Sequence, residues 1–349
     1  MYFRKMILLK IITSPLALIY WLLASSRNAL FRWGILQQYK SSIPVISIGN
    51  LCMGGSGKTP HVALILEQIY STNTAVISRG YGRKTKVLIE GNSKVHTSKD
   101  IGDEPMELLK KFEGPTFKMI VDGNRKNGLK YLEKQPKKTK LVILDDGFQH
   151  QYVKRDLNIL LTDFNQPFYN DCILPIGQLR EPKKEAQRAD LIMVTKCPEE
   201  LPIELKNKFK QHIALYSSAK IVFTKITYQG FENKRKGAIT TEGNKKFLLV
   251  TSIANPKPIY QHLNEKKIHY SPKRYRDHHN FTKKEIEDIL RQSRPFDGII
   301  TTEKDWMRLK DTALVNAISL DILILKIKIE FIDSKDQIQF KEHISALIN

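Results

Sequence analysis

Short apolar runs alternate with stretches of helical periodicity from residue 43 to about residue 225. The runs are rich in Val and Ile, which favours strands, and apolar residues at helical spacing between them predict helices such as Val62–Tyr70 and Met106–Phe112. The predicted strands are Ile43–Ile48, Ala75–Ser78, Phe117–Val121, Leu141–Leu144, Asn158–Leu161 and Leu191–Val194. This alternation is typical of an α/β fold whose mostly parallel sheet has helices on both faces and binds ligands at the carboxyl ends of its strands.

A polar, lysine-rich interval, Phe231–Lys246, separates this block from a second one. The second block predicts a smaller α/β domain, and Ile221–Tyr228 is expected to pair with Ile322–Phe331 as a two-stranded link. The elements predicted in it are Phe247–Thr251, a helix near Pro258–Asn264, the basic segment His269–His279, a helix from Thr282, Gly298–Thr301 and Ile322–Ile329.

Residues 6–24 form a third region, which is mostly apolar and has Tyr20 and Trp21 near its end. Lys10 and Pro15 interrupt it, so it is a poor membrane-spanning helix. We expect an amphipathic anchor that lies on a membrane, with a buried core helix as the alternative.

The chain has a net charge of +21, from 57 Lys and Arg against 36 Asp and Glu, which bears on the ligands that it could bind. Such a charge attracts anions: nucleic acid, anionic lipid headgroups or phosphorylated substrates, although a lysine-rich composition explains it equally well. No groove-like cluster of aromatic and basic residues indicates nucleic acid. The three cysteines lack metal-binding or disulfide spacing, which favours a reducing compartment.

A strand, a glycine-rich turn and the opening of a helix follow one another in residues 43–60, IPVISIGNLCMGGSGKTP. This order is that of a phosphate-binding P-loop, in which Lys58 would reach the β- and γ-phosphates and the Thr59 hydroxyl would bind Mg²⁺. Cys52 stands where the first glycine of the usual loop would be. Thr195–Pro198 lacks the terminal Asp of a guanine-reading element, which favours ATP over GTP. The residues expected to bind the nucleotide are Gly54, Gly55, Ser56, Gly57, Lys58 and Thr59.

Two acidic pairs follow predicted structural elements. Asp145 and Asp146 end a buried strand, where a P-loop enzyme holds Mg²⁺. Asp103 and Glu104 open a helical stretch, so they either cap that helix or serve metal binding and proton abstraction.

Arginine-bearing loops and a histidine pair complete the candidates. The loop Ser78–Arg83 and Arg180 offer guanidiniums for phosphate contact or charge neutralisation. His278 or His279, next to Asp277, could act as a base or as the partner of one near neutral pH.

Several motifs, taken together and in order, resemble the tetraacyldisaccharide 4′-kinase family, the lipid A 4′-kinases of Gram-negative bacteria. The resemblance runs from the apolar N-terminus to Asp305. The motifs are Gly49–Asn50 with GGSGKTP, SRGYGR, GDEP, LDDGFQH, LPIGQLREP, DHHNF and TTEKD. It implies transfer of the γ-phosphoryl group of ATP to the 4′-hydroxyl of a tetraacylated glucosamine disaccharide 1-phosphate, on the cytoplasmic face of the inner membrane.

The resemblance also implies three parts and a role for each motif. The parts are residues 1–40, a membrane-associated helical segment; residues 41–228, a P-loop kinase domain; and residues 229–349, a smaller α/β domain with the two-stranded link. Asp103 would be the base, with His278 as its partner across the cleft. The further implied residues are Lys58 for catalysis, Thr59, Glu104, Asp145 and Asp146 for Mg²⁺, and Arg79, Tyr81, Arg83, Arg125 and Arg180 for substrate or phosphate.

Two other classes of protein share some of these features. A membrane-associated P-loop ATPase that acts as a switch in targeting or assembly would need no base for a sugar hydroxyl. A nucleic-acid-dependent ATPase is suggested by the charge alone. No obligate protein partner is evident.

Overall fold

The computed structural model describes residues 2–69, 72–233, 241, 243–277, 279, 281–309 and 320–348, with side chains from residue 13 onward. The strands are β1 (Val45–Asn50), β2 (Thr74–Ser78), β3 (Ile89–Glu90), β4 (Phe117–Val121), β5 (Leu141–Asp145), β6 (Leu157–Asp163), β7 (Leu191–Cys197), β8 (Lys220–Asn233), β9 (Lys246–Thr251), β10 (His269–Arg274), β11 (Gly298–Thr302) and β12 (Asp321–Phe331). The helices are α1 (Tyr2–Arg32), α2 (Lys58–Gln68), α3 (Ser98–Ile101), α4 (Asp103–Phe112), α5 (Arg125–Glu133), α6 (Ile203–Ala214), α7 (Lys257–Glu265), α8 (Lys283–Ser293), α9 (Glu303–Leu309) and α10 (Ser334–Ile348), with 3₁₀ turns at Phe168–Asn170 and Lys183–Arg188.

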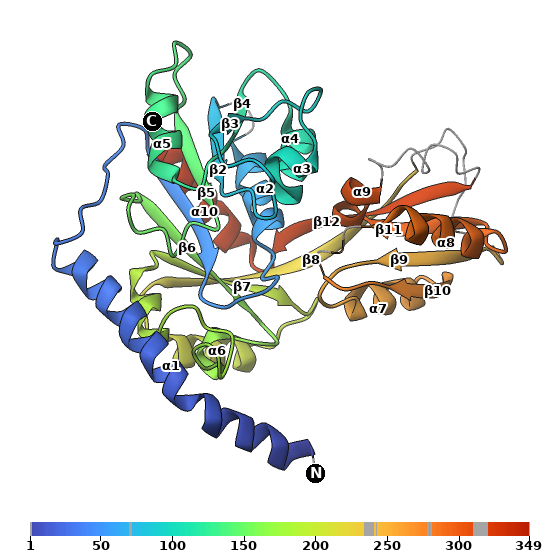
Figure 1. Ribbon diagram of the computed structural model, residues 1–349, viewed down its shortest axis with the longest axis horizontal. Coiled ribbons are helices and arrows are strands. Elements are labelled where there is room, and N and C mark those ends of the chain that lie inside the picture. The colour runs from blue at the N-terminus through green and yellow to red at the C-terminus, as the bar shows by residue number, and fades with distance from the viewer. Residues whose placement is uncertain are drawn as a thin grey trace.

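One twelve-stranded sheet runs through the described part of the chain, in the order β10-β9-β11-β12-β8-β7-β6-β1-β5-β2-β4-β3 (Figure 1). Within it, β8 pairs with β12 and β3 with β4 in antiparallel fashion, and the other neighbours are parallel. The predicted α/β fold with a large, mostly parallel sheet is confirmed.

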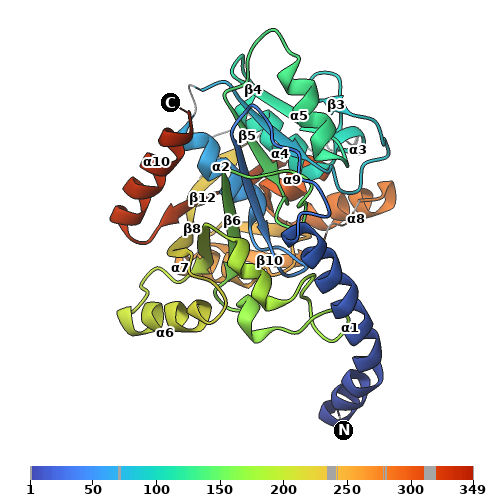
Figure 2. The ribbon, with the colours of Figure 1, turned by 90° about the vertical axis from the view of Figure 1, so that its left-hand side faces the viewer.

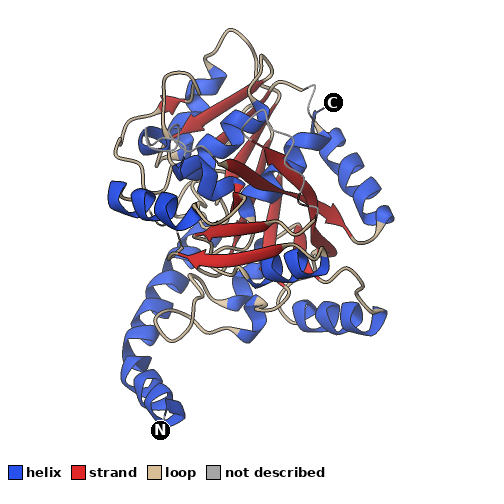
Figure 3. Cartoon of the chain, turned by 90° about the vertical axis from the view of Figure 1, so that its right-hand side faces the viewer, coloured by secondary structure: helices blue, strands red, loops and turns tan. Residues whose placement is uncertain are grey.

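Helices cover both faces of the sheet (Figure 3). Successive side chains of a strand point to opposite faces. Accordingly, Ile46 and Ile48 pack into the core that α2, α4 and α10 cover, whereas Val45 packs into the core that α5 covers. The buried central strands thus fix which loops meet at the carboxyl edge of the sheet.

The predicted two-stranded link is present as the pairing of β8 with β12. Its register runs from Thr224 opposite Phe331 to Asn233 opposite Leu323. The sheet thus continues from the part that contains β1–β7 into the part that contains β9–β11, and these two parts are called the two halves of the molecule below. The predicted polar interval therefore begins inside β8, and residues 234–240 and 242 of it lie outside the described residues. The boundary expected between residues 228 and 229 falls within this strand, and the division into domains stays a prediction.

Two edge strands have no counterpart among the predicted strands. β3 is two residues long, and β10 is the strand within the basic segment His269–His279. Both lie at the ends of the sheet. Edge strands tolerate charged residues and proline, here Pro272, so their residue pattern differs from that of buried strands.

Helix α1 runs along one side of the body, and its N-terminal part projects beyond it (Figures 1 and 2). Ala17, Asn28 and Phe31 are buried against the body, and the Tyr20 hydroxyl donates a hydrogen bond to the Arg180 carbonyl at 2.9 Å. Among the described residues, no helix combines the length and the apolar character that crossing a bilayer needs.

Candidate functional site

The predicted site residues gather at the carboxyl edge of the sheet. The P-loop follows β1, the Arg79 loop follows β2, the Arg125 loop follows β4, and Asp145 ends β5. Since these strands are parallel neighbours, their ends lie side by side.

The P-loop has the conformation that its glycines permit. Gly54 and Gly57 have φ values of 106° and 82°, which favour glycine, and Gly57 is the N-cap of α2. Apart from the adjacent residues of the chain, no atom of the described residues lies within 4 Å of a Cβ built on Gly54 or Gly55, so the loop borders open space there. Lys58 is the first residue of α2, so the N-terminus of this helix, whose first backbone N–H groups have no partner within the helix, directly follows the loop.

Side chains from the end of β7 brace the P-loop, and sequence reasoning missed them. Lys196 Nζ donates to the Gly55 carbonyl and to Asp163 Oδ2, each at 2.6 Å. Thr195 Oγ1 donates to the Ser56 carbonyl at 3.2 Å. The sequence analysis weighed Thr195–Pro198 only as a possible guanine-reading element, not as a support of the P-loop.

His61 on α2 connects the end of the P-loop with β8. Its Nδ1 lies 2.7 Å from the Gly57 carbonyl and its Nε2 lies 2.9 Å from Thr224 Oγ1 on β8. Burial lowers the pKa of His61 to about 4, so the imidazole is neutral. A neutral ring that donates from Nδ1 to the carbonyl accepts at Nε2 from the threonine hydroxyl.

Asp145 and Asp146 are adjacent but differ in environment. Asp145 is buried, accepts a hydrogen bond from Ser78 Oγ at 3.2 Å, and has its pKa raised by burial first and then by the Glu104 and Asp146 carboxylates. Burial also disfavours the charge of Asp146, but Lys58 and then Arg180 outweigh it and lower the pKa of Asp146.

The contacts of Asp146 explain this difference. Its Oδ1 lies 3.6 Å from Lys58 Nζ and its Oδ2 lies 3.2 Å from Arg180 Nη1. The P-loop lysine and the predicted loop arginine are thus brought together on one carboxylate.

The predicted arginines differ in burial and in hydrogen-bond partners. Arg125 is fully buried and donates to the carbonyls of Gly123, Asp145 and Asp146 at 3.3–3.4 Å. Arg83 donates to the carbonyls of its own loop and to the Val121 carbonyl at 3.1 Å. Both guanidiniums support the edge of the sheet, and their contact with substrate stays a prediction. Arg79 and Tyr81 are exposed on the loop after β2.

His150 marks a strongly positive region that sequence reasoning also missed. Its Nε2 is buried with no hydrogen-bond partner among the described residues. Burial, followed by the charges of Arg125, Arg79, Arg155 and Arg27, lowers the pKa of His150 to about 3. The imidazole is therefore neutral and lies near several arginine side chains.

Asp103 and Glu104 lie in the first turn of α4, but the N-cap of this helix is Gly102 and no side-chain hydrogen bond caps it among the described residues, so the capping interpretation is not confirmed. Asp103 Oδ2 accepts a hydrogen bond from Arg308 Nε at 2.7 Å. Arg308 belongs to α9, in the other half of the molecule, and its side chain is 2% exposed. Sequence reasoning missed this arginine, which lies just beyond the TTEKD motif.

A buried polar network holds Arg308. Its Nη1 donates to Ser252 Oγ at 3.1 Å. Asp305, which is fully buried, accepts hydrogen bonds from the Ser252 hydroxyl, from the Ser252 backbone N–H at 3.0 Å and from Thr302 Oγ1 at 2.8 Å. The TTEKD motif thus builds the support of a side chain that reaches Asp103.

Of the two candidate histidines, His278 lies outside the described residues. His279 Nε2 lies 3.0 Å from Glu285 Oε1, and the ring stacks on Tyr275 with centroids 4.9 Å apart. Asp277 Oδ1 lies 3.9 Å from Lys304 Nζ on α9. The assignment of His278 as partner of Asp103 stays a prediction.

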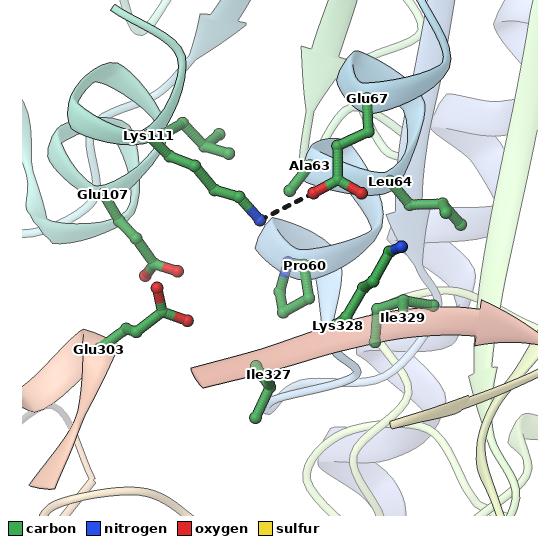
Figure 4. A pocket seen from close by; sticks show the side chains of 11 residues that line it. Pro60, Ala63, Leu64, Glu67, Glu107, Lys111, Glu303, Ile327, Lys328 and Ile329 are labelled. Atoms are coloured by element: carbon green, nitrogen blue, oxygen red, sulfur yellow. Dashed lines mark ion pairs between the residues drawn. The ribbon is translucent and has the colours of Figure 1, made fainter. Parts of the chain in front are cut away.

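A pocket lies between α2, α4, α9 and β12, beside the start of α2 (Figure 4). Glu107 and Glu303 point toward one another across it, and Lys111 pairs with Glu67 at 3.0 Å. Burial, followed by the Glu303 and Glu104 charges, raises the pKa of Glu107 to about 7.

Comparison with known proteins places this geometry in a family. The model of the tetraacyldisaccharide-1-P 4′-kinase family matches residues 9–349. The chain belongs to this family.

Named members are similar to the chain over most of its length. A tetraacyldisaccharide 4′-kinase of Cytophaga hutchinsonii is 39% identical over 87% of this chain and 86% of its own. One of Phocaeicola vulgatus is 37% identical over 96% of this chain and 94% of its own. The crystal structure of LpxK from Aquifex aeolicus in complex with ATP has a TM-score of 0.75 and 25% identity, covering 98% of this chain and all of that one.

The residues around the acidic pair fit the Mg²⁺ ion that a P-loop kinase of this family would use. Asp145 Oδ1 and Asp146 Oδ1 are buried, and no hydrogen bond from the described residues reaches either of them. The described residues contain no group of three or more His, Cys, Asp or Glu that could hold a metal alone. Mg²⁺ usually needs only one or two carboxylates, because waters and substrate phosphates complete its shell.

Proposed function

We propose that this protein is a lipid kinase that transfers the γ-phosphoryl group of ATP to the 4′-hydroxyl of tetraacyldisaccharide 1-phosphate. The product would be lipid IVA, in the biosynthesis of lipid A. The observation that carries the proposal is the ion pair of the P-loop lysine with the acidic pair in a member of this family, with Glu104, the neighbour of Asp103 in the chain, near enough to raise the pKa of Asp145.

The nucleotide side of the reaction depends on the P-loop and the acidic pair. Lys58 would exchange its contact with Asp146 for the β- and γ-phosphates, and the N-terminus of α2 adds its N–H groups and dipole. Thr59, Glu104, Asp145 and Asp146 would hold Mg²⁺. When bound, this ion supplies charge neutralisation on the phosphate oxygens.

Asp103 would act on the acceptor side by accepting the proton of the 4′-hydroxyl as the oxygen attacks phosphorus. A sugar hydroxyl is a weak nucleophile, and a positioned base typically contributes about 10²–10⁴-fold to such a step. We assign His278 as the partner of this base. Arg180 and the arginines around His150 would hold the phosphates of the two substrates.

We also propose that α1 attaches the enzyme to the cytoplasmic face of the inner membrane. Leu16, Ile19 and Leu23 are 54–67% exposed, on the side of the helix away from buried Ala17. A row of exposed large apolar side chains is costly in water and suits the interface of a bilayer. Removal of residues 1–24 should therefore weaken sedimentation with anionic lipid vesicles while ATP binding is kept. A truncated protein that still sediments fully would exclude this role for α1.

The experiment that tests the proposed reaction is a phosphate-transfer assay with γ-labelled ATP, Mg²⁺ and tetraacyldisaccharide 1-phosphate in detergent micelles. Label should enter the lipid with the native protein and with Lys110→Ala, a control at an exposed lysine on α4, but not with Lys58→Ala. Release of labelled inorganic phosphate without labelled lipid would instead favour a membrane-associated ATPase switch.

A further inference from the structure

Asp103 receives its described hydrogen bond from a residue 205 positions away in the sequence. Arg308 Nε lies 2.7 Å from Asp103 Oδ2, a length typical of a strong, charge-assisted hydrogen bond. The two residues lie on α4 and α9, which belong to the two halves that β8 and β12 join. The contact therefore links the candidate base to the other half of the molecule.

The guanidinium of Arg308 is itself fixed. It is almost fully buried, its Nη1 donates to Ser252 Oγ, and it lies 3.8 Å from Asp305 Oδ1. Asp305 in turn accepts three hydrogen bonds, two of them from Ser252. A planar guanidinium held in this way offers its Nε–H in one direction, toward Asp103.

The face of α9 that carries Arg308 also contacts the loop that contains the candidate histidines. Lys304 precedes Arg308 by one helical turn and lies 3.9 Å from Asp277, the residue before His278 in the sequence. Residues four apart share a face of a helix. Helix α9 thus contacts both the start of α4 and the DHHNF loop.

We propose that Arg308 is a positioning residue of the phosphoryl transfer, and that it orients the Asp103 carboxylate toward the acceptor hydroxyl through the Nε–Oδ2 hydrogen bond. The bonded Oδ2 is fixed, and Oδ1 is left to accept the proton. This inference rests on the proposed function, because it takes Asp103 as the base. It adds a residue from the C-terminal half on which turnover depends.

The reason for an effect on turnover is geometric. A base that rotates freely about its χ angles spends little time in line with the hydroxyl, and a displacement of about 1 Å costs roughly 10²-fold in rate. The described partners of Arg308 are Asp103, Ser252 and Asp305, whereas Lys58 and Arg180 pair with Asp146. Loss of Arg308 should therefore lower kcat and leave the KM for ATP nearly unchanged.

The test compares kcat and KM of Arg308→Met with those of Arg291→Met, which removes an exposed arginine that pairs with Asp288 on α8. We expect kcat to fall about 10–100-fold in Arg308→Met with both KM values within about threefold, and no change in the control. Arg308→Lys should recover part of the loss, because it restores a cation but not the planar fork. An unchanged kcat in a folded Arg308→Met would overturn the proposal.

A double-mutant cycle separates positioning from a structural role. If Arg308 acts through Asp103, Arg308→Met should cause little further loss in an Asp103→Asn background. Multiplicative losses, or a KM for ATP that rises as much as kcat falls, would contradict the proposal. If Arg308→Met is too unstable to measure, Ser252→Ala replaces it, because this variant removes one support of Arg308. We expect a smaller fall in kcat than for the loss of Arg308 itself, and an unchanged kcat would overturn the proposal.

The same experiments distinguish this inference from the function on which it rests. Absence of lipid phosphorylation by the native protein, or near-normal turnover in Asp103→Asn, would contradict the proposed function. Loss of turnover in Asp103→Asn with an unaffected Arg308→Met would contradict the positioning role alone.

Discussion

Lys58 and Asp103 reach the site from two regions that are held in different ways. Lys58 opens α2 directly after the P-loop, whose supports, Lys196 and His61, come from the same half of the molecule. Asp103 lies at the start of a helix and is held by Arg308 from the other half. The hydrogen bonds described for the P-loop thus come from one half, whereas the position of Asp103 depends on how the two halves pack. Substitutions in the two regions should accordingly separate binding of ATP from turnover.

The largest effect is expected on the nucleotide side. Lys58→Ala should lower kcat by about 10³-fold or more and weaken ATP binding, since it removes a cation from the transferred phosphoryl group. Steady-state phosphate transfer and equilibrium binding of a fluorescent ATP analogue measure the two effects. Normal ATP affinity in this variant would show that the lysine does not reach the phosphates before the reaction.

The acceptor side should respond differently. Asp103→Asn keeps the size of the side chain but removes the base, so kcat should fall about 10²–10³-fold. ATP affinity, measured with the same fluorescent analogue, should stay within about twofold. If ATP affinity falls with kcat, the two regions are not separable and the comparison fails.

A smaller effect is expected from the support of the P-loop. Lys196→Ala removes a charge-assisted hydrogen bond to the Gly55 carbonyl, and such a bond typically contributes about 1.5–3 kcal/mol. The KM for ATP should rise about tenfold or more with a smaller change in kcat. Lys225→Ala, which removes an ion pair with Glu199, is the control. Equal KM values in the two variants would remove Lys196 from the nucleotide region.

The smallest effect concerns stability, at the contact of α4 with α9. The pKa of Glu107 rises from 4.5 to about 7 because of burial first and then Glu303 and Glu104. Between these pH values the folded protein keeps a proton that the unfolded chain has lost, so this residue lowers the free energy of unfolding as pH rises. Glu107→Gln should therefore match the native protein near pH 4 and exceed its stability by about 1–2 kcal/mol above pH 7.

Urea unfolding of both proteins at several pH values tests this expectation. A constant difference between the two curves at all pH values would show that ionisation of Glu107 is not the cause. A difference in the free energy of unfolding that appears only as pH rises would show that the contact of Glu107 on α4 with Glu303 on α9 is pH-sensitive.

Much of the fold and of the nucleotide region could be predicted from the sequence, because the signals are local. Strand β1, the glycines and Lys58 are contiguous, and Asp145 directly follows the apolar residues of β5. The predicted pairing of β8 with β12 depended on two long apolar runs, and the structure confirms it.

The remaining features depend on contacts between distant residues. Arg308 follows the TTEKD motif within α9, but no sequence signal connects it with Asp103, which it reaches because α9 packs against α4. The sequence around His61 looks like that of any histidine on the apolar face of a helix, so nothing in it predicts that His61 connects Gly57 with Thr224. Strand β10 carries a basic pattern because it lies at an edge of the sheet.

The measurement that tests the central claim most directly is the position of the transferred phosphate. The native protein would be incubated with ATP, Mg²⁺ and tetraacyldisaccharide 1-phosphate, and the lipid product analysed by phosphorus NMR and fragmentation mass spectrometry. We predict a bisphosphorylated lipid with the new monoester on the 4′-oxygen of the non-reducing sugar, formed by native protein and absent with Asp103→Asn. A product phosphorylated at another oxygen, or hydrolysis of ATP with no change in the lipid, would contradict the account.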